Sequence, residues 1–212
     1  MNTLEHQSSF LQLIARVFAG VGGGLLGTSL ALLVIMGVSL SPSATESGLQ
    51  NSQEFTGIIL ILVIFVASFV SNMSALFFLT LTDASKYRFK KHILQGGFFA
   101  NISLFIFALP FYITISDHEL LLSIAGVHIF LAASSSALFA EIFSGIKYVV
   151  SGVVGVGIAQ MIMIFTYIAL GAPSTDTMVT ILFIPFIWFL LPLFIFLTEK
   201  IHTLFFSNLQ NS

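Results

Sequence analysis

The chain has 212 residues and a formal net charge of −2 at neutral pH; 57% of its residues are hydrophobic and only 8% are charged. Ordinary globular chains are about 25% charged, so this composition excludes a soluble protein and predicts one that is embedded in lipid. No long basic run supports nucleic-acid binding, and the lack of cysteine excludes disulfides and thiolate metal sites.

Six apolar segments follow one another along the chain, near residues 17–40, 57–81, 93–115, 120–140, 148–171 and 177–198. Each approaches or exceeds the roughly 20 apolar residues that a helix needs to cross the hydrocarbon core of a membrane. Backbone groups in lipid must be hydrogen-bonded within their own segment, and these long runs do not alternate as barrel strands do. The sequence therefore predicts an all-α, polytopic bundle of six transmembrane helices.

Three regions are expected: a short amphipathic amino-terminal segment (1–16), the six-helix domain (17–198) and a carboxy-terminal tail (199–212). If every apolar segment spans the membrane, one side holds both termini and all seven basic residues, which are Arg16, Lys86, Arg88, Lys90, Lys91, Lys147 and Lys200. Basic residues favour the cytoplasmic side. We therefore expect a multi-pass protein of the cell (inner or plasma) membrane with both termini in the cytoplasm.

Short motifs recur at similar places in the chain. Ser-Ala-Leu-Phe occurs at 74–77 and 136–139, and Lys-Tyr at 86–87 and 147–148. Acidic residues close the second, fourth and sixth segments; they are Asp83, Glu141 and Glu199. These recurrences favour either three repeated helical hairpins or a chance similarity between segments rich in leucine and phenylalanine.

Small residues at helical spacing mark two faces. They are Ala19, Gly20, Gly23, Gly24 and Gly27 in the first segment, and Ser151, Gly155 and Ala159 in the fifth. Small residues let helix backbones approach closely and gain van der Waals contacts. We interpret both faces first as packing inside the bundle. The alternative is that a partner membrane protein docks on the first helix.

Few polar side chains lie at depth. His128 and Gln160 fall near the predicted midplane, whereas Asn72 and Asn101 lie about 14 Å from the cytoplasmic ends of their segments, at about 1.5 Å per residue. We expect the two asparagines to bond each other across antiparallel helices. These four residues predict either a solute-binding pocket or interhelical hydrogen bonds without further function. No residue pattern predicts a metal, a cofactor or a catalytic group.

The basic stretch between the second and third segments contains Lys86, Arg88, Lys90 and Lys91. We expect it to anchor the protein to anionic lipid at the inner surface.

Two functional hypotheses follow, both non-enzymatic. The first is a small transporter or permease component that binds a small solute near the bilayer midplane. The second is a structural or assembly subunit of a membrane complex. An intramembrane enzyme is less well supported, because no acid, base or nucleophile constellation lies at depth.

Overall fold

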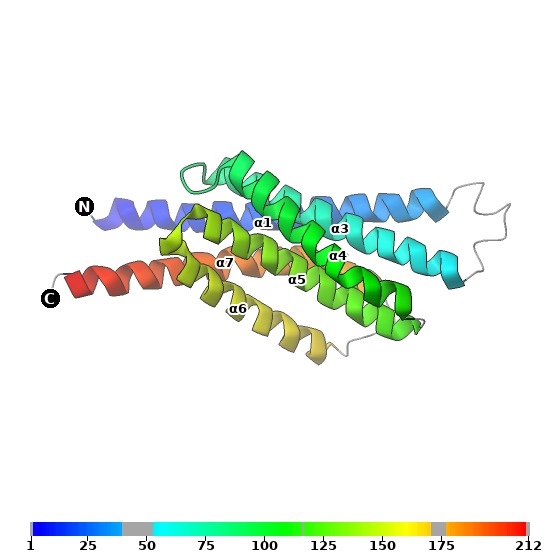
Figure 1. Ribbon diagram of the computed structural model, residues 1–212. Helices are drawn as coiled ribbons and strands as arrows, with labels where there is room; N and C mark the ends of the chain where they lie inside the picture. Colours follow the sequence, from blue (N-terminus) through cyan, green and yellow to red (C-terminus); the bar gives the residue numbers. More distant parts are fainter. Residues whose placement is uncertain (1, 40–52, 116, 171–176, 211–212) are drawn as a thin grey trace.

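The computed structural model describes residues 2–39, 53–115, 117–170 and 177–210. Within these ranges it is an elongated bundle of helices without strands (Figure 1). The helices are α1 (Asn2–Ser39), α3 (Gln53–Thr82), α4 (Phe98–Thr114), α5 (His118–Ser144), α6 (Ile146–Ala169) and α7 (Thr177–Gln210), with the π-helical segment η2 (Phe89–Gly97) leading into α4. Among the described residues, six helical stretches are long and apolar enough to cross a membrane, which confirms the prediction of an all-helical chain with six such segments.

The first and last helices of the chain extend beyond the predicted spans. α1 begins at Asn2, so the predicted amino-terminal segment is continuous with the first span, and α7 runs through most of the predicted tail. Hydropathy identifies the part of a helix that contacts lipid, and a helix can continue past it into water. The turn between α5 and α6 is a single residue, Gly145, whose φ of 134° only glycine adopts readily.

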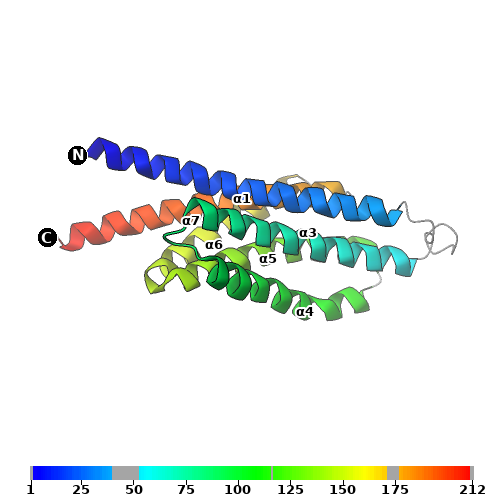
Figure 2. The same cartoon turned by 90° about the horizontal axis from the view of Figure 1, so that it is seen from above.

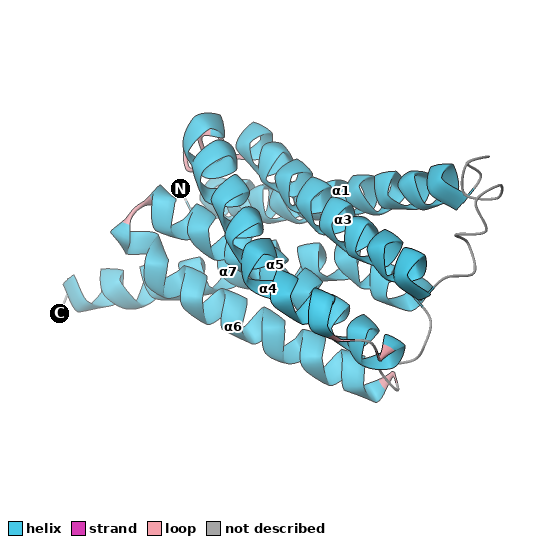
Figure 3. Ribbon diagram, turned by 45° about the vertical axis from the view of Figure 1, so that its right-hand side comes forward, coloured by secondary structure: helices cyan, strands magenta, loops and turns pink. Residues whose placement is uncertain are grey.

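α5 lies in the centre of the bundle and contacts α3, α4, α6 and α7. α1 packs on the outside against α3 and α7, and α6 packs against α5 and α7. The amino and carboxy termini lie at the same end of the bundle (Figures 1 and 2). We call this end the terminal end; the turns that join α3 to η2 and α5 to α6 lie there as well (Figure 3).

The glycines of α1 lie directly against two neighbouring helices. A Cβ atom on Gly23 would lie 2.2 Å from the backbone nitrogen of Ala75 in α3, and one on Gly20 would lie 2.2 Å from the carbonyl oxygen of Trp188 in α7. Gly27 and Gly24 repeat these two contacts one turn further along, and Ala19 is buried beside them. The small face of α1 is thus filled by the protein's own helices, and an assembly partner would need another surface of α1.

The small face of α6 packs against α7 in the same manner. A Cβ atom on Gly155 would lie 2.7 Å from the Cα atom of Ile195, and Ala159 is fully buried. The carbonyl oxygen of Ser151 accepts a hydrogen bond of 2.8 Å from the Thr198 hydroxyl. These contacts match the interpretation of this face as internal packing.

Candidate functional site

Five charged side chains from three helices and from the turn after α3 meet at the terminal end. Arg16 of α1 donates to Asp83, which follows α3, at 2.6 Å and to Glu199 of α7 at 2.9 Å. Lys86, in the turn after α3, pairs with Glu141 of α5 at 2.6 Å and also with Glu199. We call these five residues the ion cluster. Glu199 accepts from both cations, so the two halves of the cluster form one connected network.

The ion cluster is buried. Arg16, Asp83, Lys86 and Glu141 expose only 4%, 5%, 8% and 1% of their surface, and Glu199 is half-buried. Removing charges from water costs several kcal/mol per ion, so such groups persist only when each is paired. Two cations face three carboxylates here. Burying charged residues near a membrane costs much free energy, so we consider a functional role for them before a purely stabilising one.

Aromatic rings complete the surroundings of both cations. The Lys86 ammonium lies 4.8 Å from the ring centroid of Tyr87 and 4.5 Å from that of Tyr148. The Arg16 guanidinium lies 5.2 Å from the centroid of Phe196. Ring faces attract cations electrostatically, most strongly where water is excluded. The Tyr87 hydroxyl also donates to Glu141 at 2.6 Å, which ties the ring to the cluster.

The turn after α3 fixes the position of Lys86. The backbone N–H of Lys86 donates to the Asp83 carbonyl at 3.1 Å, and the Ser85 hydroxyl donates to the Asp83 carboxylate at 2.7 Å. Burial raises the pKa of the Asp83 carboxyl, but hydrogen bonds from Ser85 and Arg16 lower it by more, so this pKa lies below its usual range. Burial, followed by the nearby Glu141 carboxylate, raises the pKa of Tyr87 well above its usual value, which keeps its hydroxyl a donor.

The lowered pKa of Asp83 predicts acid sensitivity. Because the folded pKa lies below the unfolded value of about 4, the stabilisation is complete above pH 4 and is lost as the pH falls through the folded pKa. We expect the unfolding midpoint of the purified protein to fall steeply below pH 4, and Asp83→Asn to flatten this dependence. A thermal series between pH 3 and pH 6 checks this, with Asp117→Asn as a control; equal slopes for Asp83→Asn and the wild type would contradict it.

A cavity of about 370 Å³ opens beside the ion cluster. Its charged lining comprises four basic residues, Arg16, Lys86, Lys147 and Lys200, and two carboxylates, Asp83 and Glu199. Lys147 and Lys200 are exposed, whereas Ser151 lies in the buried wall. Lysine and arginine therefore outnumber carboxylates in the lining by four to two, and its most buried charged groups belong to the ion cluster.

The predicted pairing of the two asparagines is confirmed. The Asn72 amide donates to the Asn101 carbonyl oxygen at 2.7 Å across α3 and α4. The Asn101 amide donates in turn to the Ser136 hydroxyl at 3.0 Å, and the Trp188 indole donates to Asn72 at 2.9 Å. All four side chains are buried, and their polar atoms bond one another.

His128 and Gln160 contact different neighbours. The Gln160 amide of α6 donates to the Phe130 carbonyl at 2.9 Å and also to the Ser134 hydroxyl, both in α5. His128 instead faces α4, where its ring centroid lies 5.8 Å from that of Tyr112. Buried polar atoms normally have a partner. Among the described residues, His128 Nδ1 and the Tyr112 hydroxyl have none.

The unpaired Tyr112 hydroxyl predicts a stabilising substitution. A buried hydroxyl without a partner costs about 1–3 kcal/mol, so Tyr112→Phe is expected to leave stability unchanged or raise it by about 1 kcal/mol. The matched control is Tyr87→Phe, which removes a hydroxyl that donates to Glu141 and should destabilise. Thermal unfolding in one detergent compares the two variants. A marked loss of stability in Tyr112→Phe would show that the hydroxyl has a partner.

The basic stretch divides into two parts. Arg88, Lys90 and Lys91 are exposed, as lipid contact requires. Lys86 differs from the expectation, because its ammonium is buried between two carboxylates and two tyrosine rings. Its role in this structure is to hold the ion cluster together.

Sequence reasoning did not identify the ion cluster as a site. The sequence contained one indication of it. An acidic residue closes each of the second, fourth and sixth segments, and alternate spans end on the same side of a membrane, so this recurrence indicates that Asp83, Glu141 and Glu199 lie at one end. Among the described residues, no three His, Cys, Asp or Glu side chains are placed so that together they could hold a metal ion. In comparisons with protein-family models, curated protein sequences and solved structures, the chain has no match.

Proposed function

We propose that the protein is a transporter component for a small anionic solute, and that this solute enters from the cytoplasm through the cavity beside the ion cluster. The proposal rests on one observation: the cavity and the ion cluster lie side by side. A cavity of about 370 Å³, in which four lysines and arginines face two carboxylates, lies beside buried ion pairs that connect α1, α5, α7 and the turn after α3.

The distribution of basic residues supports the cytoplasmic position of this end. Arg16, Lys86, Lys147 and Lys200 line the cavity, and Arg88, Lys90 and Lys91 follow Lys86 in the chain, in the turn and in η2. These are all seven lysines and arginines of the chain. Positively charged ends remain in the cytoplasm when helices insert. Both termini would then lie in the cytoplasm, and the protein would lie in the cell membrane.

The lining indicates the chemistry of the solute. Arginine and lysine side chains bind carboxylate and phosphate groups through charge-assisted hydrogen bonds. Lys147 and Lys200 line the mouth of the cavity and are exposed, so they are positioned to attract an anion. Arg16 and Lys86 lie deeper, and each is already paired with carboxylates. An incoming anion would compete with Glu199 and Asp83 for these cations.

That competition suggests how the solute would pass. Exchange of partners at Arg16 and Lys86 would weaken the contacts that α7 makes to α1 and to the turn after α3. A two-state transport cycle needs such contacts to break on one side at a time. The mid-membrane site expected from the sequence has less support, since Asn72, Asn101 and Gln160 are bonded to neighbouring groups.

Anion binding to the purified protein tests the proposal. Unfolding midpoints are measured with inorganic phosphate, sulfate and succinate against sodium chloride at equal ionic strength. We expect at least one anion to raise the midpoint, because a ligand at 100 times its Kd stabilises by about 2.7 kcal/mol. The double variant Lys147→Gln/Lys200→Gln should reduce this shift, whereas Arg88→Gln/Lys90→Gln, with the same loss of charge outside the cavity, should keep it.

Transport is then measured in proteoliposomes with the labelled anion that stabilises the protein. We expect uptake above that of empty liposomes and a reduced rate in Lys147→Gln/Lys200→Gln. A protein that none of the three anions stabilises, or that takes up no more anion than empty liposomes, would contradict the proposed function.

A further inference from the structure

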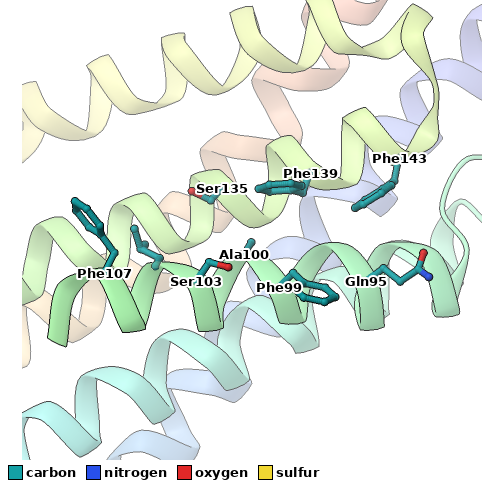
Figure 4. Close-up of a pocket in the computed structure, with 9 residues that line it drawn as sticks. Gln95, Phe99, Ala100, Ser103, Phe107, Ser135, Phe139 and Phe143 are labelled. Atoms are coloured by element: carbon teal, nitrogen blue, oxygen red, sulfur yellow. The ribbon is translucent and has the colours of Figure 1, made fainter.

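A groove between α4 and α5 lies on the outside of the bundle, away from the ion cluster. Its volume is about 650 Å³, and Figure 4 shows the residues that line it. One wall comes from η2 and α4 and the other from α5. Both helices belong to spans that are long and apolar enough to cross a membrane. In a membrane, this outer groove would face the hydrocarbon of the bilayer.

The groove is mostly apolar. Phe99 and Phe107 of α4 and Phe139 and Phe143 of α5 border it, and small side chains such as Ala100 and Ser135 form parts of its lining (Figure 4). The phenylalanine side chains form the walls of the groove around the small residues, so that a flexible hydrocarbon chain in it would contact protein on two sides.

Its length matches one leaflet of the bilayer. Gln95 and Phe107 are twelve residues apart, which is about 18 Å along a helix. Half of the hydrocarbon core measures about 15 Å. One acyl chain that enters beside Gln95 would thus end near Phe107.

A series of residues leads from the groove to a positively charged side chain. Gln95, Phe99, Ser103 and Phe107 line the groove at four-residue spacing, and Lys91 is the next member of the series toward the terminal end. Lys91 and Gln95 lie about one turn apart in the π-helical segment η2, and the later members share a face of α4. Lys91 is exposed. It stands where the headgroup of a lipid would lie if the acyl chain of that lipid occupied the groove.

We infer that the groove binds an anionic phospholipid of the leaflet at the terminal end, with one acyl chain between α4 and α5 and its phosphate beside Lys91 and Gln95. Lys90 and Arg88 are exposed nearby and add to the positive potential. A zwitterionic lipid gains the same apolar contact and less from the charges. The groove therefore selects by charge as well as by fit.

Lipid retention by the detergent-purified protein tests this inference. Phosphatidylglycerol and phosphatidylcholine with identical acyl chains are added in turn, and bound lipid is counted by native mass spectrometry. We expect tighter binding of phosphatidylglycerol, and Lys91→Gln should reduce that preference about fivefold, the equivalent of about 1 kcal/mol per basic residue. Lys91→Arg, which keeps the charge, should retain the preference.

A second pair of variants tests whether the acyl chain lies in the groove. Ser103→Leu and Ser135→Leu fill the groove from opposite walls and should each lower the binding of both lipids, whereas Val153→Phe on the exposed face of α6 should not. Inorganic phosphate should not displace the lipid, because it lacks the chain. Equal binding of the two lipids by the wild type would overturn the inference. So would unchanged binding in both leucine variants, or a second protein copy that covers the groove in place of lipid.

Discussion

Replacement of Arg16 by methionine is expected to lower the free energy of unfolding by about 3–5 kcal/mol, the range found when one partner of a buried ion pair is removed. Arg16 donates to Asp83 and Glu199 at the same time, so its loss removes the salt-bridge partner of Asp83 and leaves Glu199 with Lys86 alone. Methionine has a similar apolar stem, which keeps the packing against Phe196 and isolates the effect of the charge. Reversible unfolding in mixed micelles measures the difference.

Two further variants make this result interpretable. Arg88→Met removes an exposed arginine and is expected to change stability by less than about 1 kcal/mol. Arg16→Lys keeps the charge but loses the planar fork that reaches two carboxylates, and should fall between Arg16→Met and the wild type. If Arg16→Met were as stable as Arg88→Met, the ion pairs would contribute nothing and the ion cluster would not hold the four elements together.

Alanine substitutions at adjacent glycines of α1 are expected to have opposite effects. At Gly23 a new Cβ would lie 2.2 Å from the backbone of Ala75, so α1 and α3 must separate, and overpacking of this kind costs about 1–3 kcal/mol or more. At Gly22 a new Cβ meets nothing within 4 Å, and alanine favours the helix by up to about 1 kcal/mol.

Since the two variants make the same chemical change one residue apart, each is the control for the other. Their unfolding free energies are compared in one detergent. Equal effects at the two positions would contradict the close approach of α1 to α3, and with it the position of Arg16 opposite Asp83.

The sequence predicted the fold class well because the membrane imposes a strong and simple constraint. Uninterrupted apolar runs can satisfy their backbone groups in lipid only as helices, so the six spans followed from hydropathy. The pairing of Asn72 with Asn101 also followed, since adjacent antiparallel spans place equal depths opposite each other. The glycine spacing of α1 predicted close packing but could not identify α3 and α7 as the neighbours.

The candidate site was harder to predict because it depends on which helices are neighbours. Arg16 and Glu199 are 183 residues apart in the chain and meet only because α1 packs against α7. Lys86 appeared from the sequence to be one of several surface lysines. Its burial follows from the turn at Asp83, a short-range feature whose consequence is set by the distant Glu141 and Glu199.

The most direct test of the proposed cytoplasmic anion cavity uses single cysteines, for which the cysteine-free chain is already a suitable background. Ser85→Cys places a thiol in the cavity lining at the terminal end, and Thr114→Cys places one at the opposite end of α4. We expect a membrane-impermeant thiol reagent to label Ser85→Cys only from the cytoplasmic side, more slowly when the stabilising anion is present, and Thr114→Cys only from the other side. Labelling of Ser85→Cys from outside the cell, or at a rate that the anion does not change, would contradict the proposed cavity and its orientation.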